Sequence, residues 1–567
     1  MNLLAALPGL RSILNDGRGL RGADVIAGII TGLVLVPQAV AFAQLAGLPA
    51  QVGLAAGMLP MVVYALLGSS RTLSVGPVSV AALMVFDVVQ RHPGQASTVV
   101  PLLAAQAAVF LWLLWLFRLE VVTRVFSHPV LNGFTVAAAL LILWSQLTPL
   151  LGGVVNMAAG VQGVVGHPTA LAGLLAALAL YSYNQILGPW LKRRMGAQWG
   201  ATLALLLSRL GPLLLLVVAA TLFAANASGF AAAWQVVGSV PSSVLQLDVA
   251  WLGGVTPGLF WAVLPSAIMV AVVGYVESFA VAQSLAQKRR ESLDVRAEML
   301  ALSAANGVAS LCGAMPVAGG FSRSMVNFAA GARTQLASVV AAVFSFAAVL
   351  LAAGLFNYVP KFALAAIIIV AIIPLVSLGE LRKLWRTDRS EALVWLGTFA
   401  GVLLIGLEQG LLLGAALGLV VYFAHSFAPH MAVMGRVPHT EHFRNVLRHS
   451  VDTFPGLLLL RFDESLTFLN ASKLKDMVQK QSQACANLSN VVLSGAAINH
   501  IDSSGAHALL EIAQDLQDAG VGFHLAEIKG PVLDYFASSG FQQAFAGRVF
   551  LSVQEAVDGL AAVPTAA

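Results

Sequence analysis

The chain has 567 residues, of which 58% are hydrophobic and 10% are charged, and its mean hydropathy is +0.84. Soluble domains carry about a quarter charged residues, so this composition excludes a wholly soluble protein. The formal net charge is +5, and the basic residues stand between apolar segments instead of forming a continuous basic face. That distribution argues against a nucleic-acid partner.

Apolar segments long enough to span a bilayer follow one another from residue 24 onward. A spanning helix needs about 20 mostly apolar residues. The residues before the first segment do not have the pattern of a cleavable signal peptide. We predict fourteen spans, of which the third and the tenth are short, at residues 24–45, 52–68, 76–90, 101–118, 128–148, 168–188, 211–226, 259–286, 297–313, 322–330, 336–357, 361–379, 391–407 and 409–428.

Loop charges predict how these spans are oriented. Apart from Arg323, the loops that follow odd-numbered spans carry two basic residues, Arg91 and Lys361. The loops that follow even-numbered spans carry sixteen: Arg71, Arg118, Arg124, Lys192, Arg193, Arg194, Arg209, Lys288, Arg289, Arg290, Arg296, Arg333, Arg382, Lys383, Arg386 and Arg389. Because basic loops stay on the cytoplasmic side, both termini are expected in the cytoplasm.

Polar residues return at ordinary frequency after Phe427, and Pro429 and Pro438 suggest a short linker. Strands are predicted at 456–462, 491–497, 522–528 and 549–553, and helices at 469–482, 505–519, 531–538 and 553–563. This alternation is typical of a compact α/β domain. We therefore predict a transmembrane domain over residues 1–430 and a soluble domain over residues 437–562.

Several common catalytic motifs are missing from the sequence. No lysine follows a glycine, so there is no phosphate-binding Walker loop, and no HExxH, paired CxxC or GxSxG motif occurs. Cys312 and Cys485 are too few for a disulfide framework or a cysteine metal site. We therefore expect no enzyme, no cofactor and no metal, and a secondary transporter or a channel remains.

Three segments interrupt the apolar pattern, at 36–42, 74–79 and 319–324. The last two open the short third and tenth spans, which are seven apart, as an inverted repeat of seven requires. Two short helices in matched places can put their N-termini at mid-membrane, where the helix dipoles attract an anion, and Arg323 adds a positive charge. The alternative is that Gly, Pro and Ser only allow close packing of membrane helices.

Glu277 lies deep in the eighth span, where a carboxylate must be protonated, paired or bound to a cation. It could couple ion movement to the anion, or it could form a structural ion pair with Arg323. Asp87 and Glu408 stand near span ends, where a solvated role is expected.

In the soluble domain, Asp502 and Ser503 precede a predicted helix and are expected to cap it. Phosphorylation of Ser503 or Ser504 is the alternative function of this motif.

These segments resemble the SulP (sulfate permease) family, and the soluble domain resembles a STAS domain through the motif at 502–505. The resemblance covers nearly the whole chain in the right order. The matching segments are 24–28, 37–42, 46–49, 68–77, Glu277, 321–324, 326–327 and 334–335.

The resemblance implies fourteen segments in two inverted repeats of seven, divided into a core and a gate domain that move by an elevator mechanism, and a homodimer. Glu277 takes the position of the residue linked to the coupling ion, and Ser503 is a candidate regulatory residue. The residues predicted to bind the substrate are Gln38, Phe42, Gly76, Val78, Ser322 and Arg323.

The leading prediction is a secondary transporter of small oxyanions in the inner membrane, with sulfate as substrate and H⁺ symport as coupling. A Na⁺- or H⁺-coupled bicarbonate or dicarboxylate transporter is the first alternative. A passive anion channel, or a scaffold that recruits partners through the STAS domain, is the alternative of another class.

Overall fold

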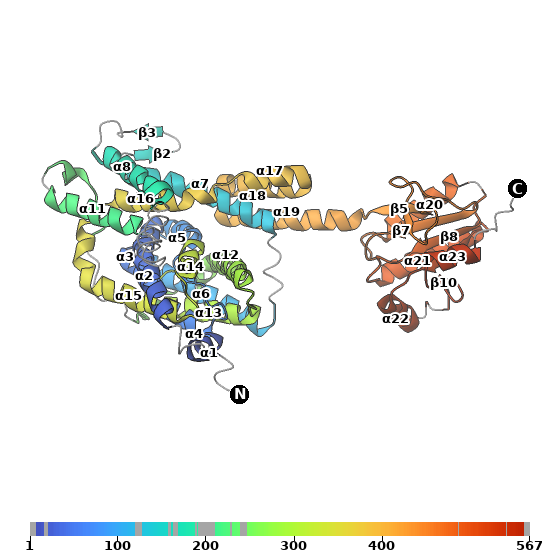
Figure 1. Ribbon diagram of the computed structural model, residues 1–567, viewed down its shortest axis with the longest axis horizontal. Coiled ribbons are helices and arrows are strands. Elements are labelled where there is room, and N and C mark those ends of the chain that lie inside the picture. Colours follow the sequence, from blue (N-terminus) through green and yellow to red (C-terminus); the bar gives the residue numbers. More distant parts are fainter. Residues whose placement is uncertain are drawn as a thin grey trace. The chain divides into compact units, whose positions relative to one another are not determined.

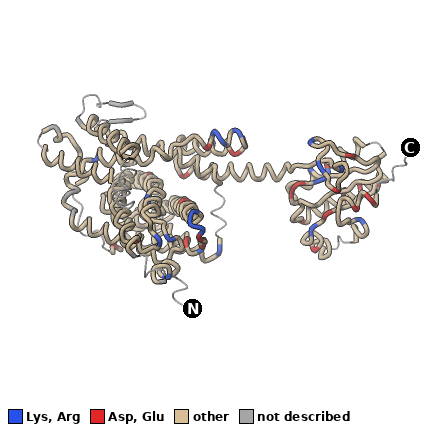
Figure 2. Tube along the Cα trace, in the orientation of Figure 1, with Lys and Arg blue, Asp and Glu red and all other residues tan. Residues whose placement is uncertain are grey.

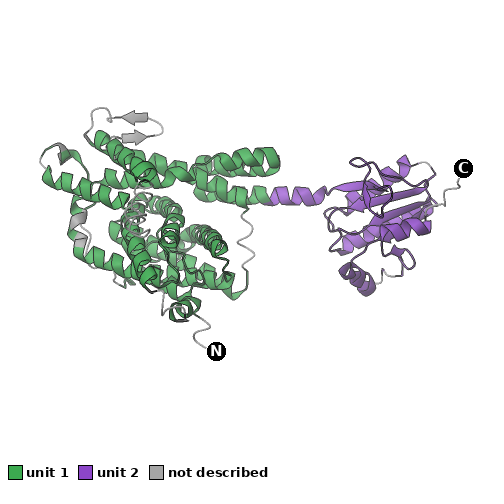
Figure 3. Cartoon of the chain, in the orientation of Figure 1, with its two compact units in different colours: residues 1–418 green, residues 419–567 purple. Residues whose placement is uncertain are grey.

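The structure is a computed structural model in which the chain forms two compact units, residues 1–418 and residues 419–567 (Figure 3). In the first unit the charged residues gather near the ends of helices, whereas in the second they are spread over all of it (Figure 2). The described residues are 7–15, 21–119, 127–152, 154–156, 160–162, 168–187, 190, 210–226, 229–238, 247–485, 487–539, 541 and 543–560.

The first unit is helical (Figure 1). Its longer helices are α1 (Pro8–Asn15), α2 (Arg21–Leu45), α3 (Ala50–Ala56), α4 (Leu59–Leu67), α5 (Ser79–Arg91), α6 (Ala96–Leu116), α7 (His128–Leu151), α8 (Pro168–Ser182), α11 (Gly211–Ala225), α12 (Pro257–Arg289), α13 (Val295–Leu311), α14 (Phe321–Ala329), α15 (Leu336–Ala352), α16 (Lys361–Ile372), α17 (Gly379–Thr387), α18 (Arg389–Ile405) and α19 (Leu407–Phe427). The short elements are strands β1 (Val75–Gly76), β2 (Val154–Asn156), β3 (Gly160–Gln162) and β4 (Ala318–Gly319), and turns of helix η3 (Tyr183–Leu187), η4 (Phe230–Ala233), η5 (Ala250–Gly254), η6 (Ala353–Tyr358) and η7 (Ile373–Leu375).

Each of the fourteen predicted spans overlaps at least one of these helices. Eight helices among the described residues are long and apolar enough to cross a membrane, so the number of crossings stays a prediction. Five of the loop residues used for the orientation, Arg124, Lys192, Arg193, Arg194 and Arg209, lie outside the described residues, as do residues 561–563 of the last predicted helix.

Two short amphipathic helices, α1 and α17, were not predicted. Helix α17 carries Glu380, Arg382, Lys383 and Arg386 within nine residues, a charge density that the search for apolar spans rejects. It ends at Asp388, whose carboxylate accepts hydrogen bonds from the first backbone N–H groups of α18. This capping explains why the chain turns there into the next apolar helix.

Within the first unit the helices form two groups. In one group α2 packs against α14 and α15, α13 packs against α4 and α6, and α12 packs against α5 and α6. In the other group α7 packs against α8, α16 and α18, and α17 packs against α18. The groups meet where α16 contacts α2 and where α5 contacts α7.

Strands β1 and β4 pair antiparallel, with Val75 opposite Gly319 and Gly76 opposite Ala318. Helix α5, with 13 residues, begins shortly after β1, and α14, with nine, begins directly after Gly320. Both helices are shorter than a bilayer crossing requires. The prediction of two short helices is confirmed, whereas their relation by an inverted repeat stays a prediction. Helix α2 continues as one helix through Pro37.

The second unit is a mixed sheet with helices on both faces. The strand order is β10-β9-β8-β7-β5-β6, with β7, β8, β9 and β10 parallel and β5 and β6 antiparallel to their neighbours. The strands are β5 (Met431–Arg436), β6 (Phe443–Asn445), β7 (Leu457–Phe462), β8 (Asn490–Ser494), β9 (Gly522–Ala526) and β10 (Val549–Phe550). The helices are α20 (Ala471–Ala484), α21 (Ser503–Asp518), α22 (Gly530–Ser539) and α23 (Val553–Leu560).

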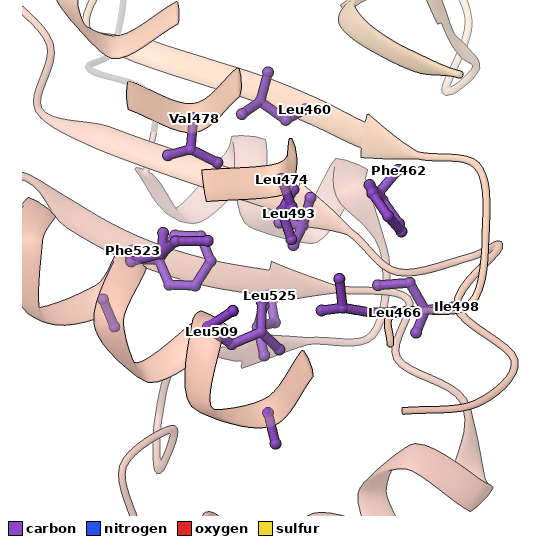
Figure 4. Packing of buried hydrophobic residues seen from close by; sticks show 14 of the residues in the cluster. Leu460, Phe462, Leu466, Leu474, Val478, Leu493, Ile498, Leu509, Phe523 and Leu525 are labelled. Atoms are coloured by element: carbon purple, nitrogen blue, oxygen red, sulfur yellow. The ribbon is translucent and has the colours of Figure 1, made fainter. Parts of the chain in front are cut away.

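Alternate residues of β7 point to opposite faces of this sheet. Leu458 and Leu460 pack with α20 and α21, as Figure 4 shows for Leu460 and its neighbours, whereas Leu457 and Leu459 pack with α23. A strand that is buried on both faces has a continuous apolar sequence, and this local pattern made β7 easy to predict.

Strand β5 lies where the sequence suggested a linker, and it begins before residue 437, so the linker prediction is wrong for residues 431–436. The flanking prolines obscured a strand that lies between β7 and β6, both of which come later in the chain.

Candidate functional site

A cavity of about 420 Å³ lies at the start of α5 and α14. This volume falls within the usual range for small-molecule sites. The cavity is lined by Gln38, Phe42, Pro77, Val78, Ser79, Glu277, Gly320, Phe321, Ser322, Arg323, Met325, Ala371, Ile372, Pro374 and Leu375. These residues come from both helix groups, because α16 and η7 supply the last four.

The structure brings together most of the residues predicted from the sequence. Six of them line this cavity: Gln38, Phe42, Val78, Glu277, Ser322 and Arg323. Gly76 is not among the lining residues and lies behind the guanidinium, where an added Cβ would come within 3.0 Å of Nη2 of Arg323. The roles of these residues stay predictions.

Two helix N-termini open toward the cavity. Val78 precedes α5 and Gly320 precedes α14, both with extended backbone, and no side chain among the described residues caps either helix. The first backbone N–H groups of a helix have no partner within the helix and carry a partial positive charge. Two such ends in one cavity favour a bound anion.

Arg323 is almost fully buried, with 1% of its surface exposed. Its Nε donates to Oγ of Ser74 at 3.1 Å, Nη1 donates to the Pro77 carbonyl at 3.2 Å, and Nη2 donates to the Ser74 carbonyl at 3.4 Å. These bonds use three of the five N–H groups of the guanidinium. Arg323 therefore braces the turn between β1 and α5 and also places a positive charge at the cavity wall.

Glu277 lines the same cavity from α12. The structure contains no ion pair between Glu277 and Arg323 or any other base in the described part of the chain. The ion pair that the sequence left open is thus not formed, and three N–H groups of Arg323 donate instead to Ser74, directly before β1, and to Pro77, directly after it. The carboxylate faces the cavity instead.

A second carboxylate, Glu298, was missed in the sequence. It is 1% exposed and accepts hydrogen bonds from the Tyr64 hydroxyl at 2.6 Å, from Ser69 N and Oγ at 2.8 Å each, and from Ser70 N at 2.8 Å. Glu298 thereby holds the segment that leads into β1. The available signal was an acidic residue inside the predicted span 297–313.

Side chains of α14 hold the rest of that segment. Nδ2 of Asn327 donates to the Thr72 carbonyl at 3.1 Å, and Oγ of Ser324 accepts from Ser74 N at 2.9 Å. The two short helices and their leading strands are therefore fixed to each other by buried polar contacts.

At the other end of α5, Arg91 forms an ion pair with Glu408 of α19, with Nη1 3.0 Å from Oε2, and also pairs with Asp87. The side chain of Glu408 is only 8% exposed, so the expected solvated role is wrong for this residue. Hydropathy could not predict that Glu408 lies next to Arg91, because the two residues are far apart in the sequence.

In the second unit, Asp502 caps α21, because its Oδ1 accepts from Gly505 N at 2.8 Å. The capping prediction is confirmed for Asp502. Ser503 is the first residue of α21, is exposed, and lines a separate cavity of about 420 Å³ together with Lys475 and His507. Its regulatory role stays a prediction. No group of three metal-ligating side chains occurs among the described residues.

The sequence was compared with models of protein families and with known proteins. A family model described as the sulfate permease family matches residues 22–398, and a model of the STAS domain matches residues 449–556. The chain is 30% identical over 567 residues to Sulfate transporter 4.1, chloroplastic, of Arabidopsis thaliana, an alignment that covers 94% of this chain and 79% of that protein. It is 28% identical over 574 residues to High affinity sulfate transporter 2 of Stylosanthes hamata, covering 96% and 84%.

Among solved structures, the murine Solute Carrier 26 family member A9 anion transporter in the inward-facing state has the same fold. Its TM-score is 0.86 at 21% identity, over 98% of this chain and 94% of that chain.

Proposed function

Since the chain belongs to the sulfate permease family, whose members are transporters and not enzymes, we propose that it is a secondary active transporter of sulfate. The observation that carries this proposal is the cavity where two uncapped helix N-termini meet Arg323. The two plant relatives described above are named sulfate transporters, which supports sulfate as the substrate.

A small oxyanion suits this cavity chemically. Backbone N–H groups at the starts of α5 and α14 can donate to several oxygens of one anion. The guanidinium has two N–H groups beyond those that hold Ser74 and Pro77, and it contributes a fixed positive charge. Gln38 and Ser322 add neutral polar groups to the lining.

Proton symport is the proposed coupling. Among the described residues, Glu277 is the only carboxylate that lines the cavity, and a carboxylate can take up and release a proton as the cavity opens to one side of the membrane or the other. The proton carried with the anion would reduce the negative charge that must cross the membrane.

Alternating access is proposed to follow an elevator mechanism. The cavity is lined by α2, α12 and α14 of one helix group and by α16 and η7 of the other, so a shift of one group against the other would change its access. We propose a transport domain over residues 1–430 and a STAS domain over residues 437–562, in a homodimer of the inner membrane. The loop charges support cytoplasmic termini.

The test uses purified full-length protein in liposomes. Radiolabelled sulfate should accumulate when an inward proton gradient is imposed, and Arg323→Ala should abolish accumulation. Bicarbonate, a dicarboxylate and a Na⁺ gradient are tested in parallel. The proposal fails if sulfate uptake ignores the proton gradient or if uptake persists in the Arg323→Ala protein.

A further inference from the structure

One buried hydroxyl connects α12 to strand β4. Ser278 has no exposed surface, and its Oγ accepts a hydrogen bond from Gly319 N at 2.6 Å. The same hydroxyl donates to the Gly274 carbonyl, one turn earlier in α12. The Ser278 hydroxyl therefore donates its proton within α12 and accepts a hydrogen bond from the backbone of β4.

The backbone at Gly274 allows this contact. A Cβ at Gly274 would lie 3.3 Å from Cβ of Ala318, so even a methyl group would crowd the packing of α12 on β4. Helix and strand are thus close enough for the Ser278 hydroxyl to reach the Gly319 amide.

The hydrogen bond links the two chain segments that carry the charged residues of the cavity, Glu277 and Arg323. Ser278 directly follows Glu277 in α12, and Gly319 is separated from α14, the helix of Arg323, by one residue. Strand β4 pairs with β1, and Arg323 donates a hydrogen bond to Ser74, the residue directly before β1. Ser278 itself is not among the residues that line the cavity.

The charges that Glu277 faces across the cavity are few. Among the lining residues, α14 contributes Arg323 and the neutral Ser322, α2 contributes Gln38, α5 contributes Ser79, and the residues from α16 and η7 are apolar. An electrostatic link between proton and anion within this cavity therefore depends on the separation of Glu277 and the start of α14.

We propose that Ser278 is a positioning residue that holds the α12 carboxylate in register with the start of α14, so that proton binding and anion binding influence each other. This inference rests on the proposed function. Coupling between two sites is a free energy that depends on their fixed geometry, and small displacements weaken it. Loss of the Ser278–Gly319 bond frees α12 to move relative to β4.

The experiment measures sulfate affinity of the full-length protein at two pH values, together with initial uptake rates in liposomes. In the unaltered protein, lowering the pH should raise sulfate affinity. In Ser278→Ala, sulfate KM should rise and the pH-dependent change in affinity should shrink by a factor of about five or more, the lower end of typical coupling. The maximal rate should change less than these two quantities.

Two variants serve as controls. Ser278→Thr keeps a hydroxyl that can bond the preceding turn of a helix, so it should restore the pH-dependent change. Ser266→Ala removes an equally buried hydroxyl, 1% exposed, from the same helix away from the cavity and should leave that change unaltered.

The inference is overturned if Ser278→Ala keeps the pH-dependent change in affinity, or if only its maximal rate falls. If that variant does not elute as a single species in size-exclusion chromatography, Ser278→Cys replaces it, and a retained pH-dependent change again overturns the inference. Absence of proton-driven sulfate uptake in the unaltered protein refutes the proposed function instead. Normal uptake with an unaffected Ser278→Ala protein refutes the positioning role alone.

Discussion

Glu277 and Arg323 line one cavity, and three N–H groups of the arginine donate to the Ser74 hydroxyl and to the Ser74 and Pro77 carbonyls. A buried guanidinium keeps its charge at a tolerable cost only when several acceptors surround it. The arginine is thus fixed by its hydrogen-bond partners, whereas Glu277 lines the cavity and is proposed to exchange a proton there.

Replacing Glu277 with Gln should separate binding from coupling. The amide has nearly the same shape but cannot titrate, so proton-driven sulfate accumulation should be lost while sulfate binding remains measurable by equilibrium dialysis. Gln44→Ala, outside the cavity lining, is the control that tests whether any polar change in a span has this effect. Accumulation that still follows the gradient in Glu277→Gln would make Glu277 structural.

Among single residues, the sequence identified those that interrupt an apolar pattern. Glu277 and Arg323 stand out because each lies in a segment that is otherwise suited to lipid. Glu298 did not stand out, because a carboxylate near the start of a span is commonly solvated. Its buried hydrogen-bond partner, Tyr64, lies 234 residues earlier. Hydropathy along the chain contains no information about such a partner.

At the level of elements, buried polar contacts hold the segment between α4 and β1 in place. Tyr64, Ser69 and Ser70 all donate to Glu298, and Asn327 donates to the Thr72 carbonyl. The segment has no regular structure of its own before β1, so these side chains determine where α5 begins.

Removing one of these donors should lower stability. Tyr64→Phe deletes the 2.6 Å hydrogen bond to Glu298 and leaves a buried carboxylate with one donor fewer. A hydrogen bond to a charged group contributes about 1.5–3 kcal/mol. We expect a lower midpoint of thermal unfolding for the detergent-purified protein. Tyr422→Phe, at a tyrosine that is 66% exposed, is the matched control. Equal midpoints for both variants would show that the Glu298 contact is energetically unimportant.

The elements that could be predicted are those whose signal is local. The short helices α5 and α14 were found because Gly, Pro and Ser break the apolar runs directly before them. Strand β5 was not predicted, because its own residues do not reveal its two partners, β7 and β6, which come later in the chain. Helix α17 was missed because its charges exclude it from any search for spans.

For the whole molecule, the unequal distribution of basic residues among the loops predicts which loops face the cytoplasm. Gln95, in the loop between α5 and α6, is expected outside, and Arg382 on α17 is expected inside. Both residues are exposed, so substitution at either position should disturb little packing.

Cysteine labelling tests this orientation. In a background with Cys312→Ala and Cys485→Ser, a membrane-impermeant maleimide applied to intact spheroplasts should modify Gln95→Cys. The Arg382→Cys protein should be modified only after permeabilisation. The reverse pattern would invert the proposed topology, and labelling of both sites in intact spheroplasts would contradict the assignment of these loops to opposite sides.

The pairing of β1 with β4 also has a consequence for biosynthesis. Ser74 and the Arg323 that binds it lie 249 residues apart, so one side of the cavity leaves the ribosome long before the other. At about 5–20 residues per second, the interval is roughly 10–50 s. During that time the backbone of β1 and the start of α5 lack the partners found in the finished protein, within a bilayer where unpaired polar groups are costly. The nascent first half is therefore the stage at which this protein depends most on the insertion machinery.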